Sequence, residues 1–170
     1  MARRTGLREF QLSVAERLRT AATRAALSSK LGFQVGGDNW FVALHQVSEV
    51  IPVPPMIHVP LTHAWFRGVA NVRGNLYGLV DFSAFQGGDA TAAGVERRVI
   101  LISDRIVTGS GLLVSRMLGL RNPEQFNAAP TPPGAPPWVA GAFTDAGGTR
   151  WLELDLAALV REQRFLEVGA

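Results

Sequence analysis

Cysteine is absent from this chain of 170 residues, and lysine and tyrosine occur once each. Without cysteine the protein has no disulfide bond, no thiolate zinc site and no cysteine nucleophile. No apolar run approaches the roughly 20 residues of a membrane-spanning helix, and the first residues, Met-Ala-Arg-Arg, lack the apolar core of a signal peptide. We therefore expect a soluble, cytoplasmic protein without direct membrane insertion.

Charged residues are few and unevenly distributed. They make up 18% of the chain against 47% hydrophobic residues, enough apolar material for one domain or for two small lobes with a shared core. Residues 1–30 hold seven basic and two acidic residues, a net charge of +5, whereas residues 31–170 hold ten basic and twelve acidic residues, a net charge of −2. A phosphate backbone would meet mainly the first segment. We expect no nucleic-acid partner, and a small-barrel nucleic-acid binder that uses this arginine-rich segment is the competing hypothesis.

The N-terminal segment has a helical pattern. Residues 7–27 contain neither glycine nor proline, and apolar residues recur three or four positions apart, at Phe10, Val14, Leu18, Ala21 and Ala25. This predicts a basic amphipathic helix within residues 1–30, ahead of a domain at residues 31–170. We expect its apolar stripe to pack on the chain's own domain, with a partner protein as the alternative.

From residue 31 onward, short apolar runs alternate with turn residues, which is typical of an all-β fold. Ten strands are predicted, at residues 31–35, 40–44, 47–51, 68–73, 76–80, 99–103, 111–114, 117–120, 139–143 and 151–154. Strands this short favour one or two small closed barrels. The proline-rich stretch at residues 127–137 indicates a linker, and Asp155 is expected to cap a C-terminal helix over residues 156–166.

The segment from Arg67 to Asp81 predicts a β-hairpin that carries one misplaced charge. Arg73 falls at the end of a weakly polar strand, and Gly74 supplies the turn. Arg73 is either a solvated strand end or the partner of Glu49, which is the only acidic residue between residues 38 and 81.

The segment of residues 52–60 is apolar but interrupted by prolines, so it cannot be a central strand. It is either a packed crossover or an exposed hydrophobic docking strip. If it docks a partner, Met56 and Ile57 are the expected anchors, because flexible and branched apolar side chains fill pockets well.

Catalytic patterns are missing. His45, His58 and His63 lack metal-ligand spacing and neighbouring carboxylates. The glycines do not form a phosphate-binding loop after a strand, and no pair of acidic residues is placed for acid–base chemistry. The sequence predicts a binding module rather than an enzyme, without metal or cofactor.

An ordered set of short motifs resembles the CheW-like coupling domain of bacterial chemosensory arrays. The motifs are Phe33-Gln-Val-Gly, Phe41-Val-Ala-Leu, Val47-Ser-Glu-Val-Ile51, Trp65-Phe-Arg-Gly-Val-Ala-Asn-Val-Arg-Gly74, Leu79-Val-Asp81, Val99-Ile-Leu-Ile102 and Gly111-Leu-Leu-Val114. The run from Gly68 to Gly74, the extra N-terminal helix and the run Leu118-Gly-Leu-Arg121 are most similar to the PilI-type members, which serve type IV pilus twitching motility.

This resemblance implies two intertwined five-stranded SH3-like barrels with a shared hydrophobic core. It also implies an adaptor that couples the regulatory domain of a CheA-like histidine kinase to the cytoplasmic tip of a methyl-accepting chemoreceptor, in arrays at the inner membrane. Glu49 and Arg73 would form an ion pair at a receptor-facing groove. Val47, Gly68 and Asn71 would belong to the same groove.

Overall fold

The computed structural model describes residues 14, 16–20, 22 and 29–170. All ten expected strands are present, and an eleventh, β9, lies inside the stretch expected to be a linker. The first sheet contains β1 (Lys30–Val35), β2 (Asp38–Ala43), β8 (Arg116–Arg121), β9 (Asn127–Ala129), β10 (Val139–Thr144) and β11 (Arg150–Leu154). The second contains β3 (Val47–Pro52), β4 (Phe66–Val72), β5 (Asn75–Asp81), β6 (Arg98–Ile102) and β7 (Ser110–Val114).

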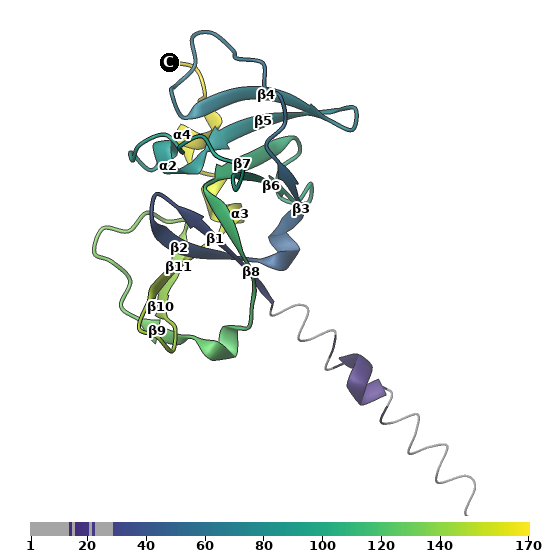
Figure 1. Ribbon diagram of the computed structural model, residues 1–170, viewed down its shortest axis with the longest axis vertical. Helices are drawn as coiled ribbons and strands as arrows, with labels where there is room; N and C mark the ends of the chain where they lie inside the picture. Colours follow the sequence, from purple (N-terminus) through teal and green to yellow (C-terminus); the bar gives the residue numbers. More distant parts are fainter. Residues whose placement is uncertain (1–13, 15, 21, 23–28) are drawn as a thin grey trace, which may run out of the picture.

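The two sheets are intertwined, as the family resemblance implies (Figure 1). The chain begins in the first sheet, crosses to the second through the short 3₁₀ helix η1 (Leu44–Gln46), builds all five strands there and returns to the first at β8. The order of strands is β8-β1-β2-β11-β10-β9 in one sheet and β3-β6-β7-β5-β4 in the other. Two pairs, β2 with β11 and β5 with β7, are parallel and join distant parts of the sequence.

Alternation along the central strands of the second sheet divides their side chains between two cores. On β6, Val99 and Leu101 enter a small cluster within that sheet, whereas Ile100 and Ile102 enter the large cluster that both sheets share. Because successive side chains of a strand point to opposite faces, a continuous apolar run such as this one is buried on both sides. The alternation of side chains along these strands therefore produces both the small cluster and the shared core.

The C-terminal region contains two short helices, so the expectation of one helix over residues 156–166 is wrong. Asp155 caps α3 (Leu156–Leu159) by accepting hydrogen bonds from two backbone amides, as expected. The chain is extended at Glu162 and then forms α4 (Gln163–Leu166). This break brings Phe165 into the core beside Phe85, with ring centroids 5.7 Å apart, and leaves Leu166 exposed.

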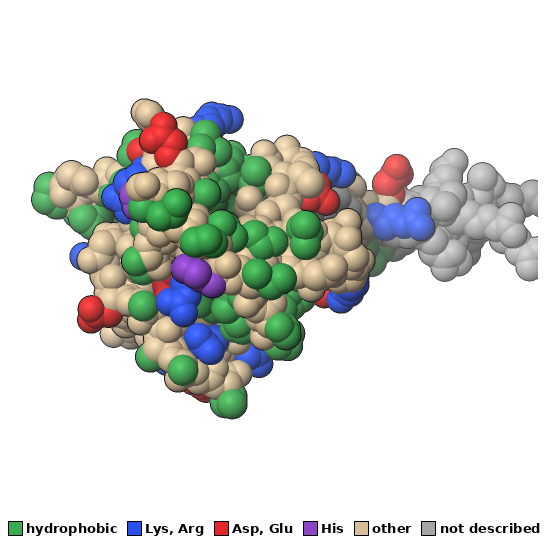
Figure 2. Space-filling view, turned by 90° about the horizontal axis from the view of Figure 1, so that it is seen from above, with side chains coloured by type: hydrophobic (Ala, Val, Ile, Leu, Met, Phe, Trp, Pro, Cys, Tyr) green, Lys and Arg blue, Asp and Glu red, His purple; other side chains and the backbone are tan. Residues whose placement is uncertain are grey.

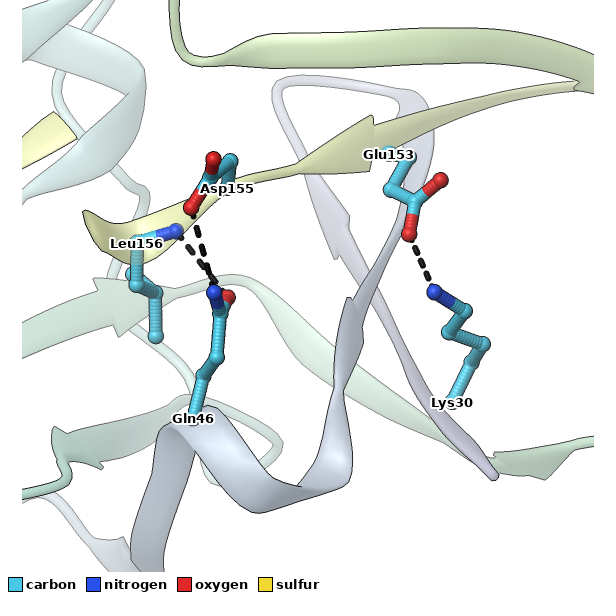
Figure 3. A network of polar contacts seen from close by, with 5 residues as sticks. All are labelled: Lys30, Gln46, Glu153, Asp155 and Leu156. Atoms are coloured by element: carbon cyan, nitrogen blue, oxygen red, sulfur yellow. Dashed lines mark hydrogen bonds and ion pairs between the residues drawn. The ribbon is translucent and has the colours of Figure 1, made fainter. Parts of the chain in front are cut away.

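A polar network joins the crossover between the sheets to the cap of α3 (Figure 3). The side chain of Gln46 donates to Asp155 Oδ1 at 3.1 Å and accepts from the amide of Leu156 at 3.1 Å. Nearby, Lys30 and Glu153 form an ion pair between β1 and β11. Gln46 therefore ties the end of η1 to the C-terminal region, and no pattern in the sequence points to this role.

The described residues of the N-terminal segment are helical but do not pack on the domain. The helical piece stands away from both sheets in Figure 1. Val14 is 37% exposed and Leu18 is 65% exposed, so the expectation that this stripe packs on the chain's own domain is wrong for both. Phe10, Ala21 and Ala25 lie outside the described residues. Within the described part of the chain, no helix is long and apolar enough to cross a membrane.

The edge of the second sheet at β4 is closed by the segment that follows β3. Ile57 and Val69 exchange two backbone hydrogen bonds of 2.8 and 2.9 Å, so the chain leaving β3 returns to pair with β4 at the opposite edge. Gly68 makes this approach possible. A Cβ atom added to Gly68 would lie 2.2 Å from the Ile57 carbonyl oxygen, and its φ of +122° is also unfavourable for other residues.

Gly68→Ala should therefore disrupt the closure of this sheet. We expect it to lower the free energy of unfolding by about 3 kcal/mol, because the added methyl group meets rigid backbone. Gly37→Ala is the matched control, since Gly37 also has a positive φ, of +100°, but no atom within 4 Å of the added Cβ. The control should cost only about 1–2 kcal/mol. Equal losses in denaturant titrations of the two variants would contradict the role of the close approach.

Candidate functional site

The tip of the β4–β5 hairpin is a tight two-residue turn. Val72 pairs with Asn75, and Arg73 and Gly74 between them have φ values of +53° and +88°. Positive φ at both central residues is the property of a type I′ turn, which matches the twist of the flanking strands. The side chain of Asn71 accepts a hydrogen bond of 2.8 Å from the amide of Gly74. Arg73 thus lies in the turn, not at the end of the strand as expected.

Arg73 and Glu49 form a bidentate ion pair, as one of the two sequence hypotheses predicts. Arg73 Nη1 donates to Glu49 Oε2 at 2.6 Å, and Nη2 donates to Oε1 at 2.7 Å. Two parallel hydrogen bonds fix the plane of the guanidinium group relative to the carboxylate. Because β3 and β4 are the two edge strands of their sheet, this pair joins the tip of one edge hairpin to the opposite edge strand.

The pair is accessible to solvent, with side-chain exposures of 73% for Arg73 and 34% for Glu49. Hydrogen bonds from Arg73 hold the pKa of the Glu49 carboxyl below its ordinary value; partial desolvation opposes them, and the charge of Arg73 lowers this pKa further. The pKa of Arg73 is raised in turn, first by its hydrogen bonds to Glu49. An exposed pair of this kind adds little to stability, so its position favours a role in recognition.

The other predicted groove residues take different positions. Asn71 is exposed beside the pair and shapes the turn. Val47 begins β3 and packs partly against the shared core. Gly68 is buried and has no side chain to present, so its contribution is the sheet closure described above. The structure thus places Asn71 and Arg73 at the hairpin tip, with Glu49 bound to Arg73, and it places Val47 and Gly68 in the strands. Whether the five residues form one receptor-facing groove stays a prediction.

The two predicted anchors of the apolar strip differ in exposure. Met56 is half-buried and packs against the small core cluster of the second sheet. Ile57 is 76% exposed, although its backbone is fixed by pairing with Val69. Figure 2 looks onto the end of the molecule that carries β4 and β5, and hydrophobic side chains are visible at several places there. The segment is thus a packed crossover that also exposes an apolar residue, and its role as a docking strip stays a prediction.

Metal-dependent or other catalytic chemistry would need a suitable cluster of side chains among the described residues. These residues include no group of three or more His, Asp and Glu side chains placed to hold a metal ion. A polar cleft lies between the β1–β2 turn and the loop after α2 (Phe82–Phe85), lined by Gly36, Asp38, Ser83 and Asp89 among others. The arrangement of Glu49, Asn71 and Arg73 offers hydrogen bonds and charge to a partner surface, not a nucleophile paired with a base.

Comparison with known proteins identifies the class. Residues 30–164 match the model of the CheW-like domain, so the chain belongs to this family, and the predicted resemblance is confirmed. A solved structure, the scaffolding protein TtCheW from Thermoanaerobacter tengcongensis, has the same fold, with a TM-score of 0.66 and 17% identity over 81% of this chain and 94% of that chain. The chain is therefore a member of the CheW-like domain family, with the same fold as that protein.

Two curated relatives extend the similarity. The chain is 30% identical to protein PilI of Pseudomonas aeruginosa over 145 residues, which make up 83% of this chain and 80% of that protein. It is 33% identical to the chemotaxis protein CheW of Rhizobium meliloti over 107 residues, which make up 60% of this chain and 65% of that protein.

The Glu49 carboxyl should titrate below the ordinary glutamate pKa of about 4.3. Because the pKa of Glu49 is lowered in the folded state, the pair contributes to stability at pH values above the ordinary pKa. This contribution is lost as the pH falls through the pKa of the folded state. In Arg73→Gln, the pKa of Glu49 should return toward normal in an NMR titration. Asp145 is the internal control, since its pKa is lowered first by Trp151 and then by backbone amides. An unchanged Glu49 pKa in the variant would contradict the coupling.

Proposed function

We propose that the chain is a non-catalytic adaptor that couples a CheA-like histidine kinase to a methyl-accepting chemoreceptor, in a pathway that controls type IV pilus twitching motility. Membership of the CheW-like family supports the adaptor role, and the similarity to PilI over most of both chains supports the link to pili. The proposed location is the cytoplasm, at receptor arrays on the inner membrane. The observation that carries the proposal is the exposed bidentate pair of Glu49 and Arg73.

The pair is suited to contact with a helical receptor surface. Two of the five N–H donors of Arg73 bind Glu49, which leaves three for the acceptors of a partner. The same two bonds hold the hairpin tip against β3, so the donors of Arg73 and the side chain of Asn71 are oriented before a partner arrives. Such preorganisation reduces the entropy lost on binding. We therefore assign receptor contact to Glu49, Asn71 and Arg73, with Val47 and Gly68 as supporting positions.

The second proposed contact is with the regulatory domain of the kinase, through the strip of residues 52–57. A strip of this kind needs exposed apolar side chains on a fixed backbone. Ile57 has both, being 76% exposed while its amide and carbonyl pair with Val69. Met56 is packed beneath the strip, so it supports the surface and contributes to docking through its exposed part.

The receptor contact is tested by a double-mutant cycle. Glu49→Ala and Arg73→Ala should each weaken binding of the chain to a receptor cytoplasmic fragment by about tenfold, and the double variant should lose less than the product of the two effects. Arg73→Lys should also weaken binding, because lysine keeps the charge but cannot form the bidentate pair. Arg116→Ala, at an exposed arginine on β8, is the control. Strictly multiplicative effects would show that the two residues act independently.

The kinase contact is tested with Ile57→Asp. A charge at this exposed position should reduce affinity for the kinase regulatory domain by at least about tenfold, while the melting temperature stays within about 2 °C because no buried group is disturbed. Val95→Asp is the matched control, at a β-branched residue that is 93% exposed in another loop. Equal affinity of the two variants, measured by calorimetry, would remove Ile57 from the docking surface.

A further inference from the structure

Leu61 occupies a turn position that leucine disfavours. Val59, Pro60, Leu61 and Thr62 form a turn in which the Thr62 hydroxyl donates to the Val59 carbonyl at 2.8 Å. Proline in the second position and a positive φ in the third are the features of a type II turn, whose third position normally holds glycine or asparagine. Here that residue is Leu61, with a φ of +59°.

Packing does not explain this leucine. Leu61 is 86% exposed, so it gains little from burial that could offset the steric cost of the left-handed conformation. Among the described residues, Arg73 is the one other non-glycine residue with a positive φ. The side chain of Arg73 makes a specific interaction from this strained position, because it binds Glu49. Backbone strain of this kind is concentrated at functional positions.

The backbone around Leu61 is held by the end of the described chain. The Leu61 carbonyl accepts a hydrogen bond of 3.0 Å from the amide of Ala170, and the amide of His63 donates to the carbonyl of Val168 at 2.9 Å. Val168 packs against the shared core. The turn is thus fixed to the body of the domain, and the leucine side chain is presented outward from a rigid support.

We propose that Leu61 is a second anchor for the kinase regulatory domain, in the same loop as Ile57. This inference rests on the proposed adaptor function. Residues 50–66, between Glu49 and Arg67, contain no Asp, Glu, Lys or Arg. The core of a protein interface is depleted of charge and rich in apolar anchors, whereas nucleic acid or an anionic lipid surface requires basic residues. The apolar loop therefore continues the strip proposed for the kinase and fits an apolar patch on that domain.

Leu61→Asn separates binding from folding, because asparagine suits the turn but not an apolar pocket. We expect affinity of the full chain for the kinase regulatory domain to fall at least about tenfold, while the melting temperature stays equal or rises by about 1–4 °C. Leu61→Met should retain affinity within about threefold. Leu120→Asn is the matched control, at a leucine on β8 with 64% exposure, and it should leave affinity unchanged.

The outcomes are distinguishable by calorimetry and thermal melting. Loss of affinity with an unchanged or raised melting temperature supports the proposal. If the wild-type chain binds the kinase domain and Leu61→Asn binds equally well, this inference is wrong and the adaptor function stands. If the wild-type chain does not bind, the kinase contact itself is overturned. A lowered melting temperature would show that Leu61 serves the fold, and loss of self-association in place of kinase binding would assign the surface to a second copy of the chain.

Discussion

The contact between the backbone of Ile57 and β4 at Gly68 is the constraint on which the rest of the second sheet depends. Its two hydrogen bonds join the chain leaving β3 to the edge strand β4, and only a residue without a Cβ allows the approach. With the sheet closed, the hairpin tip lies beside β3, where Arg73 reaches Glu49. The same pairing turns the Ile57 side chain to solvent and sets the course of the loop toward Leu61. One close approach thus positions both candidate surfaces.

The proposed function depends on a rigid sheet and on the chemistry of its exposed side chains. The alternation of β6 between the two cores anchors the second sheet on both faces, so that its exposed groups have defined directions. A preorganised surface loses less entropy on binding, which suits the proposed adaptor, because it would hold two partners in fixed geometry. The polar pair on the hairpin tip and the apolar loop after β3 offer different chemistry, and two different partners can be recognised on one small sheet.

Two strained residues lie on the surfaces proposed for recognition. Leu61 and Arg73 both adopt a positive φ that glycine or asparagine would accept more readily. Each of the two residues has a large, exposed side chain and is held in place. Leu61 is held by backbone hydrogen bonds between its loop and residues 168–170, and Arg73 is held by its ion pair with Glu49. The domain tolerates this strain because its burial of apolar side chains is extensive.

Local patterns in the sequence determined the strands and the cap at Asp155, and they limited Arg73 to two alternatives, a solvated residue or the partner of Glu49. These features depend on periodicity, turn chemistry and charge, which neighbouring residues carry. Only the tertiary structure decided the rest. β9 forms because β10 offers it a partner, the C-terminal helix breaks so that Phe165 reaches Phe85, and Leu18 is exposed because no surface of the domain covers it. Each of these outcomes depends on contacts between residues far apart in the chain. Such contacts produce no periodic pattern of residues from which they could be predicted.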